Sequence, residues 1–212
     1  MIAIIDYRAG NLTSVERALQ YLGHPCRITD SSEAIAKADR IIFPGVGAAG
    51  AAMQNLHELG LVEVIRDAAA SGKPFLGICL GYQVLFEHSD EDDTPCLGIL
   101  AGKVVRFPDD LQEGDDPRSL KVPEMGWNRV AFGGQHPVWC DLPEGSEFYF
   151  VHSYYPEGVE TDCQATTTYG MPYVCGVAQG SLVACQFHPE KSGRPGLKLL
   201  DNFCNWTSGN AQ

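Results

Sequence analysis

Basic side chains are scarce in this sequence of 212 residues. Lysine and arginine together number 15 against 27 aspartate and glutamate residues, which gives a formal net charge of −12 at pH 7. Nucleic acids and anionic membrane surfaces carry the same sign of charge, so they are poor default partners. A local basic patch is still compatible with this balance. The charge therefore disfavours such partners without excluding them.

Long apolar segments and export signals are also lacking. No apolar run approaches the roughly 20 residues that span a bilayer, and residues 1–7 contain no basic leader or cleavage site. The eight cysteines are scattered and form no Cys-x-x-Cys pair or tight Cys/His cluster. We therefore expect a cytoplasmic protein with free thiols, without a membrane span, a metal site or another cofactor.

The first ninety residues alternate between apolar runs and helical patterns. Short apolar runs predict buried strands at residues 2–6, 25–29, 40–44 and 74–79. Helical spacing predicts helices at residues 13–22, 32–37, 50–60, 61–71 and 80–88. This alternation is typical of a parallel sheet with helices on both faces.

The second half is dominated by expected strands. Turn residues separate strand patterns at residues 97–107, 128–132, 148–154, 165–169, 174–179 and 182–187. A final helix is expected at residues 196–206, and the acidic segment 109–119 is expected to be an exposed loop. Because no flexible linker is present, we predict one domain over residues 1–212. Its fold class is α/β, with a mixed, mostly parallel central sheet flanked by helices and with additional antiparallel strands.

Cys79 lies in the segment with the clearest catalytic pattern, Gly-Ile-Cys-Leu-Gly at residues 77–81. A strand pattern leads into this segment and a helical pattern follows it, as in a nucleophile elbow. The glycines permit a sharp, crowded turn. A thiol there would sit at a helix N-terminus, which favours the thiolate, and the amide of Leu80 would face a developing oxyanion. The alternative is a buried structural cysteine, our interpretation of the other seven.

His188 is the predicted catalytic base. It follows the apolar run 182–187, and Glu190 stands two residues later. A carboxylate there could accept the second ring proton and fix the tautomer, which would complete a Cys–His–Glu triad. His152 is a second candidate, ranked lower because no carboxylate lies near it in the sequence. The remaining histidines are interpreted as surface or loop residues: His24, His57, His88 and His136.

The segment Gly45, Val46 and Gly47 follows an expected strand. Glycines on both sides of Val46 would let its peptide flip, so that an amide turns toward a tetrahedral oxyanion. Taken alone, the segment favours an ordinary turn between strand and helix, or a weak phosphate loop. Neither the Walker spacing nor a complete Gly-x-Gly-x-x-Gly is present. With Cys79 nearby in the predicted sheet, we expect Val46, Gly47 and Leu80 to form an oxyanion site.

Several motifs together resemble the class I glutamine amidotransferases. They are Pro-Gly-Val-Gly at 44–47, Gly-Ile-Cys-Leu-Gly-Tyr-Gln at 77–83 and His-Pro-Glu at 188–190. Three longer blocks narrow the resemblance to the glutaminase subunits of imidazole glycerol phosphate synthases, which act in histidine biosynthesis. They are Pro-Glu-Met-Gly-Trp-Asn at 123–128, Tyr-Phe-Val-His-Ser-Tyr-Tyr at 149–155 and Gln-Phe-His-Pro-Glu-Lys-Ser-Gly at 186–193. The resemblance spans nearly the whole chain and implies a flavodoxin-like amidotransferase fold.

The resemblance implies the chemistry of the site. Cys79 would attack the side-chain amide of L-glutamine, His188 would protonate the leaving ammonia, and a glutamyl thioester would be hydrolysed. The positions that match the glutamine-binding residues of the family are Gly45, Gln83, Glu91, Ser153 and Tyr154. Glu91 would pair with the substrate ammonium group. Without the resemblance, Glu91 would be interpreted as a solvated charge in the acidic run 90–93.

The resemblance also implies a partner. Ammonia must be kept from water, where it would be protonated, so a closed route to a second site is needed. In the family this site belongs to a (β/α)₈-barrel cyclase, which joins the glutaminase as a heterodimer and forms imidazole glycerol phosphate and aminoimidazole carboxamide ribotide. The blocks that resemble the contact surface contain Asn11, Trp127, Tyr149 and Lys191. Core packing is an equal alternative for Trp127.

One position departs from the family pattern. Glu124 stands where the family usually has histidine, so coupling to the partner or the charge of the interface would differ here. Two rival functions also remain. A glutaminase of another pathway would share the triad but lack the Met-Gly-Trp-Asn block. A non-catalytic binding module on the same fold would leave Cys79 with ordinary thiol reactivity.

Overall fold

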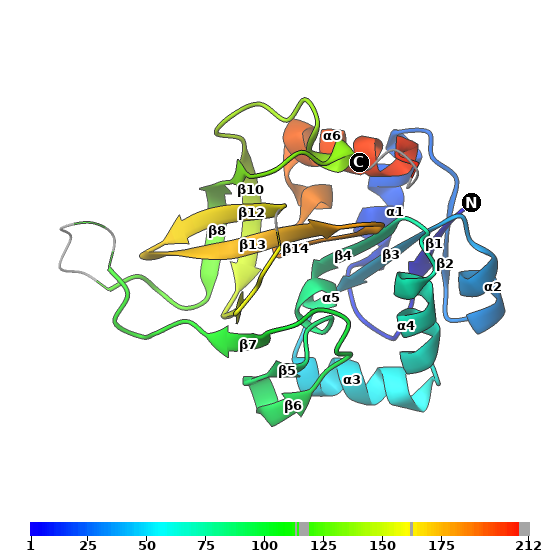
Figure 1. Cartoon of the computed structure of the whole chain (residues 1–212), viewed down its shortest axis with the longest axis horizontal. Coiled ribbons are helices and arrows are strands. Elements are labelled where there is room, and N and C mark those ends of the chain that lie inside the picture. The colour runs from blue at the N-terminus through cyan, green and yellow to red at the C-terminus, as the bar shows by residue number, and fades with distance from the viewer. Residues whose placement is uncertain (113, 115–118, 162, 208–212) are drawn as a thin grey trace.

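A sheet of eight strands forms the centre of the molecule (Figure 1). The computed structural model describes residues 1–112, 114, 119–161 and 163–207. Across the sheet the order is β2 (Cys26–Thr29), β1 (Ile2–Ile5), β3 (Arg40–Gly45), β4 (Phe75–Cys79), β14 (Leu182–Cys185), β13 (Met171–Gln179), β12 (Gln164–Tyr169) and β9 (Ala131–Phe132). Neighbours from β2 to β14 are parallel, and those from β14 to β9 are antiparallel. The mixed, mostly parallel sheet predicted from the sequence is confirmed.

Helices cover both faces of the parallel strands, and Figure 1 shows the two layers on opposite sides of the sheet. One face carries α1 (Leu12–Tyr21) and α6 (Gly193–Asn205). The other carries α2 (Ser32–Lys37), α3 (Ala49–Glu58), α4 (Val62–Ala70) and α5 (Leu80–Gln83). Each helix turns an apolar stripe to the sheet, and fully buried side chains such as Val15, Leu56 and Leu200 stabilise the fold by roughly 1.5–3 kcal/mol each. In the described part of the chain, no helix has the length and apolar character that crossing a bilayer requires.

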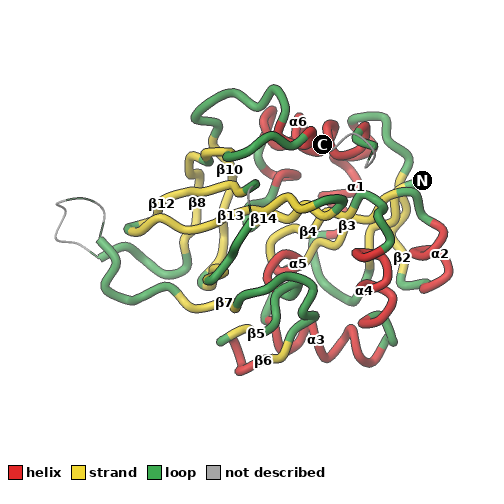
Figure 2. The backbone as a smooth tube through the Cα atoms, in the orientation of Figure 1, coloured by secondary structure: helices red, strands yellow, loops and turns green. Residues whose placement is uncertain are grey.

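The described residues also form two smaller sheets. The first pairs β8 (Glu124–Arg129) with β10 (Glu147–His152) in antiparallel register. The second has the order β11 (Tyr154–Glu157), β7 (Lys103–Arg106), β5 (His88–Ser89) and β6 (Thr94–Pro95). Figure 2 shows β8 and β10 beside β12 and β13, with β5 and β6 beside α3. Short 3₁₀ turns are η1 (Glu91–Asp93), η2 (Pro137–Trp139) and η3 (Pro189–Lys191).

Two predicted elements are much shorter than the sequence pattern indicated. The helix expected at residues 80–88 ends at Gln83, and the strand expected at residues 97–107 contains only Lys103–Arg106. The reason is tertiary. The amide of Leu97 donates to the carbonyl oxygen of Val84 at 2.9 Å, and residues 98–100 bond to the same stretch. Residues 97–100 therefore satisfy carbonyl groups that a longer helix would have used itself.

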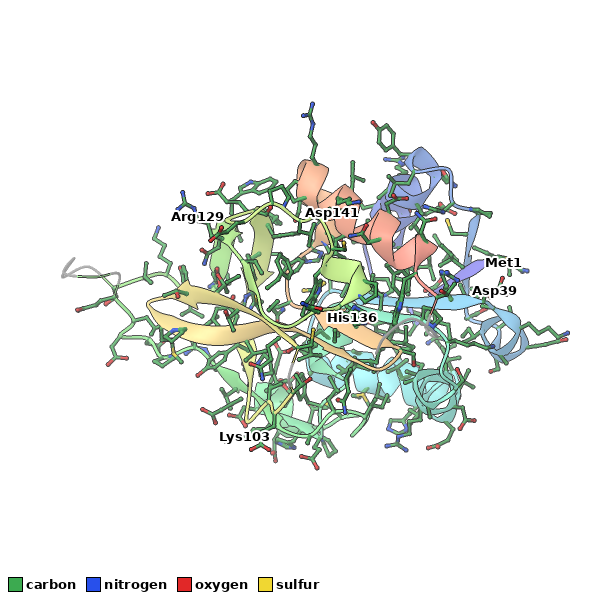
Figure 3. All side chains as sticks on the ribbon, turned by 45° about the horizontal axis from the view of Figure 1, so that its top comes forward. Met1, Asp39, Lys103, Arg129, His136 and Asp141 are labelled. Atoms are coloured by element: carbon green, nitrogen blue, oxygen red, sulfur yellow. The ribbon has the colours of Figure 1, made fainter. Side chains whose placement is uncertain are left out.

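His136 lies in a loop, as one of its two interpretations expected, but it is not a surface residue. It precedes η2, is only 8% exposed and packs its ring against Trp206, with ring centroids 4.6 Å apart. Figure 3 labels His136 near the centre of the view, whereas the paired Met1 and Asp39 lie toward its edge. The expected loop at residues 109–119 falls partly outside the described residues, at 113 and 115–118, and its Leu111 is buried rather than exposed.

Close contact between β3 and α5 requires glycine at position 81. A β-carbon on Gly81 would lie 1.8 Å from the carbonyl oxygen of Phe43, which is far inside contact distance. That oxygen belongs to the backbone of a buried strand and cannot move aside cheaply. The absence of a side chain at Gly81 therefore allows the start of α5 to lie against the backbone of β3, directly after the turn at Cys79.

We predict that Gly81→Ala lowers the free energy of unfolding by about 3 kcal/mol or more, because overpacking against backbone cannot be relieved by side-chain rotation. Gly23→Ala is the matched control. Its β-carbon would meet nothing within 4 Å, so only its positive φ of 80° adds a cost, of about 1–2 kcal/mol. Chemical denaturation of both variants measures the difference. Equal losses would contradict the close-contact argument.

Candidate active site

Cys79 occupies a strained turn between β4 and α5. Its φ of 55° and ψ of −114° place a residue with a β-carbon in a region that such residues rarely adopt. Strain of this kind costs about 1–3 kcal/mol and persists only where the surrounding structure enforces it. The nucleophile elbow expected from the sequence is therefore present as a backbone feature. The expected helix dipole is weak, however, because α5 contains only four residues.

His188 and Glu190 form a buried pair beside Cys79. Nδ1 of His188 lies 2.8 Å from Oε1 of Glu190, and the two side chains are 2% and 1% exposed. A carboxylate accepts hydrogen bonds, so it fixes the proton on Nδ1 and turns Nε2 away from Glu190. Asn11 adds a second donor to the same oxygen at 2.9 Å. The sequence analysis expected Asn11 at a partner interface, which stays a prediction. Within this chain its side chain supports the carboxylate of Glu190.

The pKa of His188 reflects its two neighbours. Burial alone lowers the pKa of this imidazole, but the charge of Cys79, its hydrogen-bonding contact and Glu190 raise it to about 10. By strict geometry Nε2 has no hydrogen-bond partner among the described residues, so we treat its contact with the sulfur as mainly electrostatic. The ring of His188 is therefore protonated at neutral pH.

A cavity of about 350 Å³ opens directly onto this pair, a volume at the small end of ligand sites. Its lining residues are Val46, Gly47, Cys79, Leu80, Gln83, Glu91, Pro123, Val151, His152, Ser153, Tyr154 and His188. The cavity brings together the predicted oxyanion segment, the nucleophile, the base and four of the five predicted glutamine-binding residues. Gly45 is the fifth, and it does not line the cavity. Its missing side chain makes room for Tyr7, whose hydroxyl would lie 1.8 Å from a β-carbon at position 45.

Glu91 is held in place at the mouth of the cavity. Its Oε2 accepts a hydrogen bond from the amide of Ala49 at 2.8 Å. Burial raises the pKa of this carboxyl, the bond from Ala49 lowers it, and the charge of Asp92 raises it further. A half-buried carboxylate at this place would gain from a cationic partner. The alternative of a freely solvated charge does not fit this arrangement.

Gln186 contacts the nucleophile and was missed by the sequence analysis. Its Nε2 lies 3.8 Å from the sulfur of Cys79, and its Oε1 accepts from Nε2 of Gln83 at 2.9 Å. Gln83 also donates to the carbonyl oxygen of Tyr154 at 2.9 Å. A signal for Gln186 was available, because an extended chain places residues two apart on the same side, and Gln186 stands two before His188.

An exposed aromatic group lies next to the buried pair. Trp127 is 55% exposed and packs edge-on against Tyr149, with ring centroids 6.1 Å apart. Nζ of Lys191 lies 5.9 Å from the centre of the Tyr149 ring, which is itself 6.5 Å from the ring of His188. Three of the four predicted interface residues therefore form one surface group beside the triad. The alternative that Trp127 belongs to the core does not hold.

His152, the second candidate base, is buried and also lines the cavity. Its Nε2 lies 3.1 Å from the hydroxyl of Tyr173 and 3.3 Å from Oε2 of Glu124. The carboxylate that the sequence did not supply nearby comes from another strand. Among the described residues, no group of three or more His, Cys, Asp or Glu side chains is placed to hold a metal ion.

Solved structures of low sequence identity share this fold. The structure of PurLQS from Thermotoga maritima matches with a TM-score of 0.70 and 17% identity, covering 96% of this chain and 97% of that one. The glutaminase domain of CTPS from Trypanosoma brucei matches with a TM-score of 0.61 and 16% identity, covering 97% of this chain and 94% of that one.

Curated relatives are much closer in sequence. The imidazole glycerol phosphate synthase subunit HisH of Thiobacillus denitrificans is 49% identical, over 98% of this chain and 92% of the relative. The subunit HisH of Nitratidesulfovibrio vulgaris is 50% identical, over 96% of this chain and 95% of the relative. The family model described as glutamine amidotransferase class-I matches residues 3–206. With the elbow, the buried His–Glu pair and these matches, the chain belongs to the class I glutamine amidotransferases.

Proposed function

We propose that this chain is the glutaminase subunit of an imidazole glycerol phosphate synthase in histidine biosynthesis, acting as one domain over residues 1–212. It hydrolyses L-glutamine to glutamate and ammonia for a cyclase subunit. The observation that carries the proposal is that Cys79 and His188 line one cavity and that His188 forms a buried pair with Glu190. The curated relatives named above, at about half identity over nearly the full chain, support the choice of pathway.

The reaction follows from the ion pair. The thiolate of Cys79 attacks the side-chain amide carbon of glutamine and forms a tetrahedral intermediate. The amide of Leu80 and an amide of the Val46–Gly47 segment stabilise its oxyanion. His188 gives its Nε2 proton to the departing ammonia and becomes the base that activates water. Water then gives a proton to His188 and cleaves the thioester, which releases glutamate and restores the thiolate and the imidazolium ion.

Glutamine binds through the polar residues of the cavity. Glu91 faces the substrate ammonium group, an arrangement that offsets the cost of partly burying the carboxylate. Gln83, Ser153 and Tyr154 hold the rest of the amino-acid head group. This orientation directs the side-chain amide toward Cys79, at the other end of the cavity.

The cyclase partner is a (β/α)₈ barrel that docks over the group Trp127, Tyr149 and Lys191. This surface combines aromatic side chains with a cation, a composition typical of energetically important interface residues. The ring of Tyr149 lies beside the ring of His188, so a partner that docks there would be next to the site of ammonia release. The barrel would use the ammonia to form imidazole glycerol phosphate and aminoimidazole carboxamide ribotide.

Cys79→Ala should reduce glutamate release by the complex by at least about a thousandfold, because no other group can form the thioester. Cys140→Ala, which removes an exposed free thiol, is the matched control and should keep full activity. Coupled-enzyme detection of glutamate measures both. Full activity of the Cys79→Ala complex would rule out the thioester mechanism.

The ring of His188 should remain protonated well above the ordinary histidine pKa of about 6.5 and lose its proton near pH 10. Replacing Cys79 with alanine removes the negative charge that stabilises the imidazolium ion, so the midpoint should fall. NMR titration of ¹⁵N-labelled histidines measures this. His136, whose pKa is lowered by burial, is an internal reference that should not respond to the substitution. An unchanged His188 midpoint would contradict the ion pair.

Trp127→Ala should weaken binding of the cyclase subunit by about 30-fold, which corresponds to the roughly 2 kcal/mol of an interface hot spot. The control is Tyr21→Ala, because Tyr21 is an exposed aromatic residue of α1, at 79%, outside the proposed interface. Calorimetric titration with the cyclase gives both affinities, and unfolding curves check that each variant is intact. Equal affinities for the two variants would remove Trp127 from the interface.

A further inference from the structure

Three buried polar side chains meet behind the glutamine cavity. They are Glu124 of β8, Tyr173 of β13 and His152 of β10. The hydroxyl of Tyr173 donates to Oε2 of Glu124 at 2.6 Å and lies 3.1 Å from Nε2 of His152. The side chains of His152 and Glu124 are 3% and 4% exposed, so they are shielded from bulk solvent. None of these three residues has a step in the reaction described above.

Hydrogen-bond chemistry fixes how many protons this cluster holds. Nδ1 of His152 lies 2.8 Å from the carbonyl oxygen of Tyr154, which can only accept, so Nδ1 carries a proton. Suppose that Glu124 were ionised and His152 neutral. The hydroxyl of Tyr173 would then donate its proton to Glu124, and the lone pair of Nε2 of His152 would have no donor to face. That arrangement leaves a buried acceptor unsatisfied, at a cost that folded proteins avoid.

One further proton would satisfy all three side chains, and it can occupy either of two positions. It can sit on Nε2 of His152, which then donates to Tyr173. Alternatively it sits on Glu124, which donates to Tyr173, while Tyr173 donates to His152. In both states every donor has an acceptor, and the cluster is neutral overall. Burial and the nearby Glu124 raise the pKa of Tyr173 well above its ordinary value, so its hydroxyl keeps its own proton. Burial likewise raises the pKa values of its titratable neighbours Cys175 and Tyr82.

The chain continues to the nucleophile. The carbonyl oxygen of Tyr154 accepts from His152 and also from Nε2 of Gln83, at 2.8 and 2.9 Å. The second proton of that amide goes to Oε1 of Gln186 at 2.9 Å, and Nε2 of Gln186 reaches the sulfur of Cys79 at 3.8 Å. Each contact in this series joins a donor to an acceptor inside the protein. An unbroken series of polar contacts therefore runs from Glu124 to Cys79.

We propose that Glu124, Tyr173 and His152 are positioning residues for the glutaminase reaction, which they serve by holding the Tyr154 carbonyl, Gln83 and Gln186 in register with Cys79. This inference rests on the proposed function for its kinetic readout. The chain acts through its hydrogen bonds and not through the charge of Glu124. Removing one link releases the Tyr154 carbonyl and lets Gln83 and Gln186 rotate away from the sulfur.

The substitution Glu124→Gln distinguishes an effect of the hydrogen bonds from an effect of the charge of Glu124. The amide oxygen of the new residue can accept from Nδ2 of Asn128, which donates to Oε1 of Glu124 at 2.9 Å. Its amide nitrogen can donate to Tyr173, which then donates to His152. Glu124→Gln therefore keeps every link without a charge, whereas Glu124→Leu breaks the chain at similar volume.

The experiment compares Tyr173→Phe with Tyr155→Phe in the full chain bound to its cyclase. Both tyrosines pack on the ring of Phe107, with centroids 5.3 and 4.7 Å away, but the side chain of Tyr155 lies outside the chain of hydrogen bonds. Tyr173→Phe should lower kcat for glutamate release about tenfold with KM changed less than threefold. Tyr155→Phe should stay within twofold of the unmodified protein. Glu124→Gln should also stay within threefold, and Glu124→Leu should resemble Tyr173→Phe.

A second readout requires no turnover. Iodoacetamide modification of Cys79, followed by peptide mass spectrometry, should slow several-fold in Tyr173→Phe because the sulfur loses the Gln186 donor. When Gln186→Leu is already present, adding Tyr173→Phe should change neither kcat for glutamate release nor the rate of Cys79 modification by more than twofold. The series of hydrogen bonds to the sulfur is already interrupted in that variant.

Three results would overturn the inference: equal effects of the two tyrosine substitutions, equal damage by Glu124→Gln and Glu124→Leu, or additive effects of Tyr173→Phe and Gln186→Leu. If the complex releases no more glutamate than its Cys79→Ala form, the proposed function fails by itself. The alkylation rates then still decide whether the chain of hydrogen bonds acts on Cys79.

Discussion

The electrostatic pairing of Cys79 with His188 is the interaction on which the site depends. The sheet makes this pairing inevitable, because β4 and β14 are parallel neighbours with Ile78 opposite Cys185. Both strands therefore release their chains at the same edge of the sheet, one into the elbow and the other toward His188. Glu190 then holds the imidazole through Nδ1, and Asn11 donates to the carboxylate of Glu190. The strained turn at Cys79 is sustained by packing that includes Gly81 against β3.

The sequence predicted the parallel half of the fold, and the residues that it named as a triad lie together in the structure, because both depend on local patterns. Apolar runs alternate with helical spacing, and the elbow and the His-Pro-Glu segment are contiguous motifs. The shortened α5 was not predictable, because residues 97–100 supply its terminal hydrogen bonds. The contacts of Asn11 with Glu190 and of Glu124 with His152 were not predictable for a similar reason. Their partners lie on strands or helices far away in the sequence, and no spacing rule identifies such contacts.

Strand β8 connects two parts of this account. Alternation along a strand turns successive side chains to opposite faces. Glu124 accordingly points to His152 and Tyr173, while Met125 and Trp127 are 65% and 55% exposed on the other side. One short strand thus presents an aromatic surface to solvent and a carboxylate to the cavity wall. Its only strand neighbour in the described residues is β10, which itself carries His152. A partner that binds this surface would therefore contact the strand that carries Glu124 and pairs with β10, which contributes His152 to the cavity lining.

The central claim is that the cavity binds glutamine and presents it to one activated sulfur among eight. A glutamine-like chloroketone, which carries the substrate head group and an alkylating carbon, tests this most directly. After brief treatment of the complex, peptide mass spectrometry should find the adduct on Cys79 alone, and free glutamine should protect that site. Labelling spread over several cysteines, or labelling of Cys79 that glutamine does not slow, would contradict the account.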